Sequence, residues 1–568
     1  MKSNNKQYDI TQKAWALPGM VTKLVFPAFS RLVAAGYILL LLSGMGCYSK
    51  PKTKNQIFHY NEQTGIASLD PAFAKNQSIM WPVHQLFNTL VALDDSLHII
   101  PSLAKSWEVA PDRLSYIFHL RDDVFFHDDA CFPGSKGRRL TAADVAFSLS
   151  RIIDQKVASP GAWIFNRKVD SLQAFVAVND STFQLRLLKP YNPILGILSM
   201  QYCSIVAPEA VKQYGSDFRR HPVGTGPFRF VAWEEGQALI MARHPNYFEK
   251  DSSGQRLPYI DGINVRFYDS KATEFLMFRQ KELEFINDID ASFKDEVLTK
   301  KGELRKDWED KIILQANPYL NTEYLGILMD TTNSLLANSP LRMRKIRQAI
   351  NYGFDRKKMV LYLRNSLGTA AESGFVPMGL PSFNATAVTG YHYDPARSRQ
   401  LLQEAGFPDG KGLPSVKLLT VSIYGEMANF IAKQLEEVGI PVKVDIVQKS
   451  LLLEMTSNSR ALFFRGSWIA DYPDAENYLS VFYSRNPAPP NYTRYKSAKF
   501  DALFEKALTE ENDSLRYILY QQADQEVIND AAIVPLWYDK SVRFVQPYVK
   551  DFKPNALNLL ELRYVRMD

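Results

Sequence analysis

The stretch VKLLTVSIYGEMANFIAKQLEEVGIPVKVDI, residues 416–446, carries the clearest structural pattern in the chain. Residues 416–421 are mostly apolar, and apolar residues at 442, 444 and 446 alternate with polar ones, so each end predicts a β-strand. Between them, residues 426–438 predict a helix that ends at Gly439, because glycine readily adopts the left-handed conformation found after helix ends. A right-handed strand–helix–strand crossover requires parallel strands, and we therefore predict an α/β fold.

Two more helices are predicted upstream of this unit. Asp394 and Pro395 mark the start of one, which ends at Gly406. Ser339 and Pro340 mark the start of the other, since proline fits the first helical position, and we expect that helix to continue through residue 354.

The first half of the chain mixes strands and helices in another order. Alternating apolar residues predict a half-buried strand over residues 114–120. A capping-box variant from Thr141 to Asp144 predicts the start of a helix. Residues 228–233 and 239–243, joined by a short turn, predict a hairpin. A mixed α/β region therefore precedes the α/β region.

Composition sets the size and class of the protein. A chain of 568 residues with 46% hydrophobic residues is long enough for two or three packed units. The formal charge is +6, of which +4 belongs to residues 1–46 (five Lys or Arg, one Asp), so +2 remains for the rest. No basic stripe stands out, which gives nucleic-acid binding no support.

The amino-terminal segment predicts export. The apolar run LVAAGYILLLLSGMG, residues 32–46, follows Lys23 and Arg31 and is shorter than the roughly 20 residues of a spanning helix. Cys47 follows small residues, so we predict a lipoprotein-type signal (1–46), lipid attachment at Cys47 and a polar tether (47–56). Simple cleavage and an uncleaved anchor are the alternatives, and Met20 is an alternative start. The mature protein would then be periplasmic or at the cell surface, anchored to the membrane by lipid.

Cysteines and histidines give no sign of a metal or a catalytic site. Beyond Cys47 only Cys131 and Cys203 remain, and either a disulfide or two free thiols fits them. The eight histidines show no HExxH pattern, there is no GxSxG nucleophile motif, and no metal or cofactor is predicted. Val223-Gly-Thr-Gly226 lacks the GK[ST] of a phosphate loop and predicts a tight turn.

Several motifs in a fixed order resemble one family. They include Pro101-Ser-Leu-Ala-Lys-Ser-Trp107, Leu140-Thr-Ala-Ala-Asp144, His221-Pro-Val-Gly-Thr-Gly-Pro-Phe228, Pro245-Asn-Tyr247, Arg347-Gln-Ala349, Tyr393-Asp-Pro395, Trp468-Ile-Ala-Asp-Tyr472 and Ile533-Val-Pro535. From about residue 55 to its end, the chain resembles the extracytoplasmic solute-binding proteins of ABC importers, in the oligopeptide/dipeptide-binding family (solute-binding protein family 5).

The resemblance implies a two-lobed clamshell of the periplasmic-binding-protein type. Lobe I would comprise residues 57–310, with an extra subdomain inserted at about 90–205, and the returning segment 531–568. Lobe II would comprise residues 311–530.

The resemblance also implies a peptide site. The segment Ser467, Trp468, Ile469 would be a strand edge that pairs with the ligand backbone, and Asp471 would bind the ligand's α-ammonium group. The alternative for Asp471 is a cap for a helix at residues 474–479. Further ligand-facing positions are expected at Trp537, Tyr538, Lys75, Asn76 and Gln77, while Arg465 and Arg485 are candidates for the ligand carboxylate.

We therefore expect a monomeric, non-enzymatic receptor that captures short peptides and delivers them to an ABC permease. The same fold binding an oligosaccharide, a nickel chelate or haem is the first alternative. An extracytoplasmic hydrolase is the second, and a signalling role would fit the same residues.

Overall fold

The computed structural model describes residues 56–170 and 173–568. The chain divides into two units, Met1–Lys54 and Asn55–Asp568, and the second of these is described below. The predicted signal, Cys47 and most of the tether lie outside the described residues. Within those residues, no helix has the length and apolar character needed to cross a membrane.

One four-stranded sheet joins segments far apart in sequence. Its order is β1 (Ile57–Asn61), β10 (Gly262–Arg266), β9 (Ala238–Arg243) and β8 (Phe228–Glu234). β1 is parallel to β10, whereas β8 and β9 form the predicted antiparallel hairpin. The start of the described chain is thus held by a strand some 200 positions later.

A second four-stranded sheet is antiparallel throughout. Its order is β4 (Ala104–Val109), β5 (Ser115–Leu120), β7 (Thr182–Arg186) and β6 (Phe175–Asn179). Helix α3 (Ala142–Ile153) packs against it and begins with the predicted capping box, in which the Thr141 amide donates to Asp144 Oδ2 at 2.8 Å.

The largest sheet contains the predicted strand–helix–strand unit. Its order is β11 (Phe285–Asn287), β17 (Ile533–Val545), β12 (Ile313–Ile327), β16 (Phe463–Ile469), β14 (Val416–Thr420) and β15 (Val442–Ile446), and β13 (Thr369–Ala370) also pairs with β17. β14 and β15 are parallel, with Val416 opposite Val442, and α12 (Gly425–Glu437) connects them. The prediction of an α/β unit here is confirmed.

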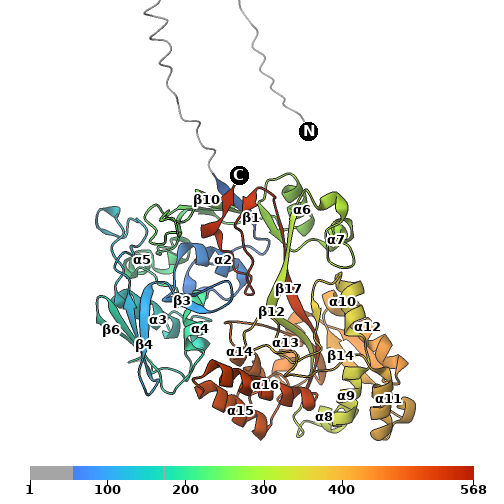
Figure 1. Cartoon of the computed structure of the whole chain (residues 1–568). Helices are drawn as coiled ribbons and strands as arrows, with labels where there is room; N and C mark the ends of the chain where they lie inside the picture. Colours follow the sequence, from blue (N-terminus) through green and yellow to red (C-terminus); the bar gives the residue numbers. More distant parts are fainter. Residues whose placement is uncertain (1–55, 171–172) are drawn as a thin grey trace, which may run out of the picture. The chain divides into compact units, whose positions relative to one another are not determined.

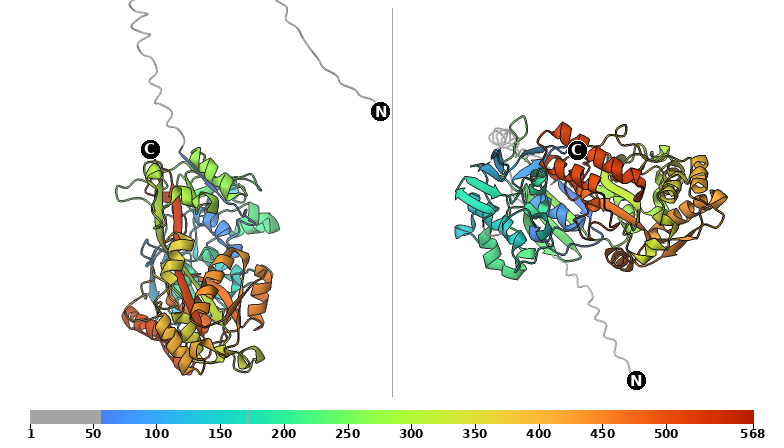
Figure 2. Two further views of the ribbon diagram at one scale, coloured as in Figure 1. Left: turned by 90° about the vertical axis from the view of Figure 1, so that its right-hand side faces the viewer. Right: turned by 90° about the horizontal axis from the view of Figure 1, so that it is seen from below.

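Smaller elements complete the described chain (Figures 1 and 2). Two short hairpins are β2 (Val91–Leu93) with β3 (Ile99–Pro101), and β18 (Val549–Lys550) with β19 (Arg566–Met567). The other helices are α2 (Gln77–Leu86), α4 (Ile194–Leu198), α5 (Pro208–Tyr214), α6 (Lys271–Arg279), α7 (Ala291–Val297), α8 (Ser334–Ala337), α9 (Arg344–Tyr352), α10 (Arg356–Arg364), α11 (Pro395–Glu404), α13 (Lys449–Ser457), α14 (Ala475–Leu479), α15 (Ala498–Thr509) and α16 (Asp513–Asn529). α15 and α16 lie side by side.

One predicted helix starts later than the sequence indicated. Ser339 does cap a turn, but Pro340–Arg342 forms only a short 3-10 helix, and α9 begins at Arg344. The reason is the buried Arg347, whose Nη1 donates to the carbonyls of Leu341 (2.9 Å) and Arg342 (3.1 Å). Those carbonyls bind a side chain instead of continuing the helix.

The buried apolar side chains form several separate cores. The largest core runs from Phe58 to Val265 and is completed by residues 545–565. Two others cover the faces of the large sheet with residues 320–537. The limits of the lobes stay the prediction given above.

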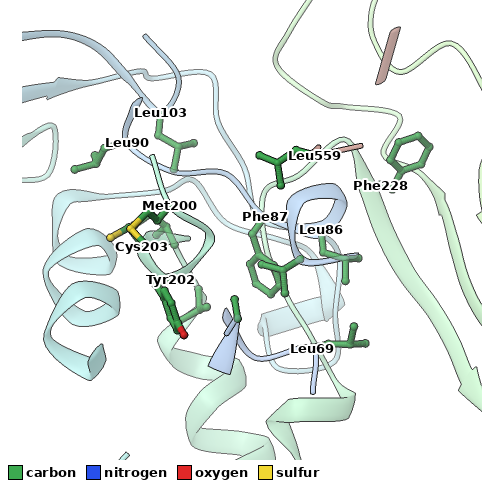
Figure 3. Packing of buried hydrophobic residues seen from close by; sticks show 14 of the residues in the cluster. Leu69, Leu86, Phe87, Leu90, Leu103, Met200, Tyr202, Cys203, Phe228 and Leu559 are labelled. Atoms are coloured by element: carbon green, nitrogen blue, oxygen red, sulfur yellow. The ribbon is translucent and has the colours of Figure 1, made fainter. Parts of the chain in front are cut away.

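Among the described residues, Cys131 and Cys203 are free thiols, so the disulfide that the sequence left open is not formed. Cys203 is buried in the first core beside Met200 (Figure 3). The backbone amide of Cys131 donates a hydrogen bond to Asp129 Oδ1. Burial raises the pKa of both thiols, that of Cys131 to about 12, which keeps them protonated.

Two glycines of the predicted tight turn allow a loop to touch helix α2. A methyl group on Gly226 would lie 2.4 Å from the Leu86 carbonyl carbon and 2.5 Å from the Gln85 carbonyl oxygen. Backbone atoms cannot move aside as a flexible side chain can, so Gly226→Ala should cost about 3 kcal/mol and displace α2.

Thermal or denaturant unfolding of the variant would measure this cost. Gly425→Ala is the matched control, because its methyl group would meet only the flexible end of Ile446 at 3.0 Å. Equal stability of the two variants would contradict the argument.

Candidate functional site

A cavity of about 540 Å³ lies where the end of β16 faces the beginning of α2. That volume is typical of small-molecule binding sites. Its lining includes residues 74–77, Met80, Trp81, Leu93, Pro160, Trp163, residues 199–202, Tyr319, residues 469–473, Leu557 and Leu559. The cavity therefore joins side chains of the first core to the end of a strand in the large sheet.

Asp471 is the only carboxylate among the described residues that line this cavity. It follows β16 directly, and it has no ion pair within the described part of the chain. Its Oδ2 accepts a hydrogen bond from Asn477 Nδ2 at 3.1 Å. Asp474, not Asp471, caps α14, because the Asp474 side chain accepts from the amide of Glu476. The capping alternative for Asp471 is therefore wrong.

Asn477 fixes the position of Asp471. This fully buried amide, on α14, accepts hydrogen bonds from Trp468 Nε1 (2.9 Å) and from the Asp471 backbone amide (3.2 Å). Trp468 does not line the cavity, and its indole supports the carboxylate through Asn477. A carboxylate held in this way meets a ligand without first having to be ordered.

The charge on Asp471 is uncompensated in this structure. Burial raises its pKa to about 6, against only a small opposing effect from the Asn477 hydrogen bond. Burial raises the pKa of the Tyr202 hydroxyl to about 12, and the negative charge of Asp471 adds to this increase. The two side chains are therefore near enough to interact electrostatically. A half-buried anion without an ion-pair partner is costly, and a cation entering the cavity would offset that cost.

The opposite wall is the amino end of α2. Asn76 caps this helix, with its Oδ1 accepting from the Ile79 amide at 3.3 Å. Gln77 Nε2 is buried without a hydrogen-bond partner. Lys75 is exposed and is the only cation among the described lining residues, and no ion pair of its ammonium group occurs within the described part of the chain. This wall thus offers an unused amide donor and a free positive charge.

Other predicted residues lie at varying distances from the cavity. Ile469 lines it and is 50% exposed, whereas Ser467 pairs with Glu323 inside the sheet. Trp537 and Tyr538 do not line it, and their ligand-facing role stays a prediction. Both are buried, and the Tyr538 hydroxyl donates to the Gly374 carbonyl at 2.7 Å. β17 has paired strands on both sides and covered faces, so neither set of its side chains reaches the cavity.

The two candidate arginines also lie elsewhere. Arg465 Nη2 is 2.5 Å from Glu323 Oε2, and its guanidinium carbon lies 3.8 Å from the Tyr424 ring centroid. Arg485 is 71% exposed and pairs with Glu505 at 2.9 Å. Neither lines the cavity.

Several lining residues were not predicted. Trp81, Trp163, Gln201, Tyr202 and Tyr319 add aromatic and amide groups to the cavity lining. None belongs to a motif with a chemical signature, and they come from four separate segments. Only the three-dimensional fold brings them together.

A buried polar contact joins the two sides next to the cavity. Tyr191, from the first core, donates to Glu476 Oε2 at 2.9 Å, and its oxygen lies 3.0 Å from the Tyr472 hydroxyl. Tyr472 also donates to Glu476. Burial raises the pKa of Glu476, while the charge of Lys168 lowers it. Lys168 Nζ lies 4.9 Å from the Tyr191 ring centroid. We call these four residues the tyrosine–carboxylate contact.

Comparison with known proteins identifies the family. The model of the bacterial extracellular solute-binding proteins, family 5 (middle region), matches residues 98–490. Heme-binding protein A of Haemophilus influenzae is 28% identical over 493 residues, which cover 82% of this chain and 84% of that protein. Glutathione-binding protein GsiB of Pectobacterium atrosepticum is 27% identical over 478 residues, covering 82% and 85%.

A solved structure agrees with these relatives. The ABC transporter-associated periplasmic binding protein DppA of Helicobacter pylori, in complex with the peptide STSA, superposes with a TM-score of 0.71 at 25% identity, covering 90% of this chain and 98% of that one. The resemblance inferred from the motifs is confirmed, as is the two-lobed α/β fold. The chain belongs to the bacterial extracellular solute-binding proteins of family 5.

Proposed function

We propose that this protein captures short peptides in the cavity at Asp471 and delivers them to an ABC permease. Family 5 proteins are extracytoplasmic receptors without enzymatic activity. The observation that carries the proposal is a carboxylate of raised pKa, held by Asn477, that faces a cavity without a cationic partner. A peptide's α-ammonium group is the cation that fits.

The rest of the cavity suits a peptide backbone and carboxylate. Ile469 and Ala470 bring the end of β16 to the cavity, where its main chain could pair with an extended ligand. Gln77 supplies a free donor and Lys75 a counter-charge for a carboxylate. Each neutral hydrogen bond contributes only about 0.5–1.5 kcal/mol, so selectivity for a zwitterion rests mainly on the two charges.

Delivery follows from closure of the two lobes around the ligand. A ligand that contacts both sides binds the closed form more tightly than the open form and so favours closure. The permease then recognises the closed, ligand-bound receptor. We further propose that lipid at Cys47 keeps the receptor at the membrane, on the strength of the amino-terminal sequence alone.

Peptide is preferred here to the other ligands of the fold. No histidine lines the cavity among the described residues, which leaves haem iron or nickel without its commonest protein ligand. A neutral oligosaccharide would leave the charge on Asp471 uncompensated.

Calorimetry with a matched pair of ligands tests the proposal. A di- or tripeptide with a free amino terminus should bind, and the same peptide with an acetylated amino terminus should bind at least 100-fold more weakly. Mass spectrometry of ligand retained through native purification should show peptide. Equal affinity for both forms, or a retained sugar or haem, would overturn the proposal.

Peptide affinity should depend on pH through Asp471. Its pKa of about 6 in the free protein means that it is ionised above that pH and becomes protonated as the pH falls through it. Only the ionised form attracts an ammonium group, so affinity should be highest near pH 7 and fall about tenfold for each unit below 6. Titrations from pH 5 to 7, where the ligand's own amino group stays protonated, would show this, and a flat profile would contradict it.

A further inference from the structure

A second cavity of about 440 Å³ borders the first, and Asp471 is not part of its lining. It is enclosed by the β2–β3 hairpin and by the returning carboxyl-terminal segment, with Leu97, Ile100, Tyr259 and Tyr564 in its lining. The two cavities have exactly three lining residues in common, Leu93, Leu557 and Leu559, which we call the leucine partition.

The backbone behind the partition is held firmly. Asn555 Nδ2 donates to the Leu559 carbonyl (2.9 Å), and the Leu559 amide donates to Asn555 Oδ1 (3.0 Å). Arg543 Nη2 binds the same carbonyl at 2.9 Å. Among the described residues these three leucines border both cavities, and a leucine side chain changes rotamer far more easily than a backbone moves.

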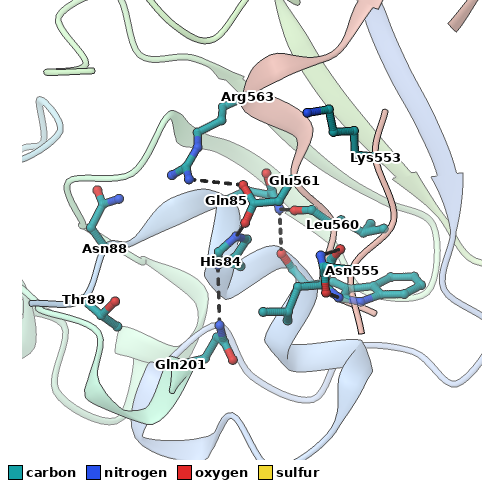
Figure 4. Close-up of polar contacts among 12 residues, drawn as sticks. His84, Gln85, Asn88, Thr89, Gln201, Lys553, Asn555, Leu560, Glu561 and Arg563 are labelled. Atoms are coloured by element: carbon teal, nitrogen blue, oxygen red, sulfur yellow. Dashed lines mark hydrogen bonds and ion pairs between the residues drawn. The ribbon is translucent and has the colours of Figure 1, made fainter. Parts of the chain in front are cut away.

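A polar network on the same side pairs two of the charges that line the second cavity, Glu561 and Arg563. His84 Nε2 is 2.5 Å from Glu561 Oε1, and Glu561 also pairs with Arg563, while Gln201 of the first cavity approaches His84 (Figure 4). These cations and others hold the pKa of Glu561 at about 2, despite its burial.

Four of the five remaining charged residues of the second cavity pair with one another. Lys553 pairs with Asp95 at 3.1 Å, and Arg566 lies 3.8 Å from Asp551. The fifth, Asp94, is bound by the side chain and the backbone amide of His98. Beside these charged groups, Leu97, Ile100, Tyr259 and Tyr564 give the second cavity apolar and aromatic surface.

We propose that the second cavity is a distal compartment of the ligand site, which receives apolar side chains of peptides too long for the first. The inference rests on the proposed function. The amino terminus stays at Asp471, and residues beyond the second or third cross the leucine partition, at roughly 3.3–3.6 Å per extended residue. The compartment would thereby set the length preference of the receptor.

The test fills the distal compartment without touching the first cavity. Ile100 lines only the second cavity, so Ile100→Trp should reduce affinity for the pentapeptide Ala-Leu-Ala-Leu-Leu at least tenfold. Affinity for the dipeptide Ala-Leu should stay within twofold. His98→Trp adds the same indole to the same hairpin, at a residue that is 68% exposed and lines neither cavity, and should change neither affinity.

Each outcome is decisive. If Ile100→Trp leaves pentapeptide affinity unchanged, or reduces both affinities equally, the distal compartment is wrong while the peptide receptor stands. If the unmodified protein binds neither peptide, the proposed function fails and the compartment with it. Should Ile100→Trp not fold, Ile100→Phe fills less volume, and its pentapeptide affinity should fall by a smaller factor with the dipeptide again unaffected.

Discussion

Replacing Asp471 with asparagine should weaken the binding of peptides with a free amino terminus about 100-fold or more. The change keeps the shape of the side chain and removes the charge. Losing one partner of a desolvated charge pair costs several kcal/mol, because the other charge is then buried alone, and each 1.4 kcal/mol is a factor of ten in affinity. Isothermal titration calorimetry would measure the loss.

The pattern across ligands identifies the cause. The variant should bind acetylated peptide as weakly as the unmodified protein does, and its affinity should no longer change between pH 5 and 7. Asp445→Asn is the control, because Asp445 lies on β15 of the same sheet and pairs only with the exposed Lys417. Undiminished affinity in Asp471→Asn would rule out the ammonium-binding role.

Tyr191→Phe should weaken peptide binding by about tenfold, because it destabilises the closed form of the protein. The change removes one hydroxyl from the tyrosine–carboxylate contact and leaves Glu476 with the Tyr472 hydroxyl alone. Hydrogen bonds to charged groups contribute about 1.5–3 kcal/mol, and the loss falls on the form in which the two sides touch. Because the closed form is the one destabilised, the rate of peptide release should rise while the rate of association changes little.

Tyr214→Phe separates this effect from a general loss of stability. Tyr214 donates to Asp129 Oδ1 at 2.8 Å, which is also a tyrosine–carboxylate hydrogen bond, but both residues lie in the first half of the chain and away from the cavity. Its removal should leave release rates unchanged in stopped-flow measurements. Equal release rates in Tyr191→Phe and the unmodified protein would show that the contact does not hold the lobes together.

The fold could be predicted where local patterns and tertiary packing agree. The alternation at Val442, Val444 and Ile446 and the stop at Gly439 gave the parallel unit correctly, because the same residues that favour each element also bury its apolar face. The helix predicted from Ser339 fails because Arg347 binds its first carbonyls from within the core. No local pattern reports such a contact.

The site could be predicted only in part, for a related reason. The family motif pointed to Asp471, and the structure brings it to one cavity with Lys75, Asn76 and Gln77, whose binding roles stay predictions. Asn477, which positions Asp471, looks like an ordinary helical residue in the sequence. Trp537 and Tyr538 lie outside this cavity, and a strand buried on both faces gives no alternation by which the sequence could show this.

The first core, which begins at Phe58, is completed by residues 545–565 near the other end of the chain. During synthesis part of this core therefore stays uncovered until those residues have emerged. Such delayed folding would keep the polypeptide incompletely folded, and so able to pass through a narrow export channel. It also means that losing a few terminal residues would open the interior of the half that was made first.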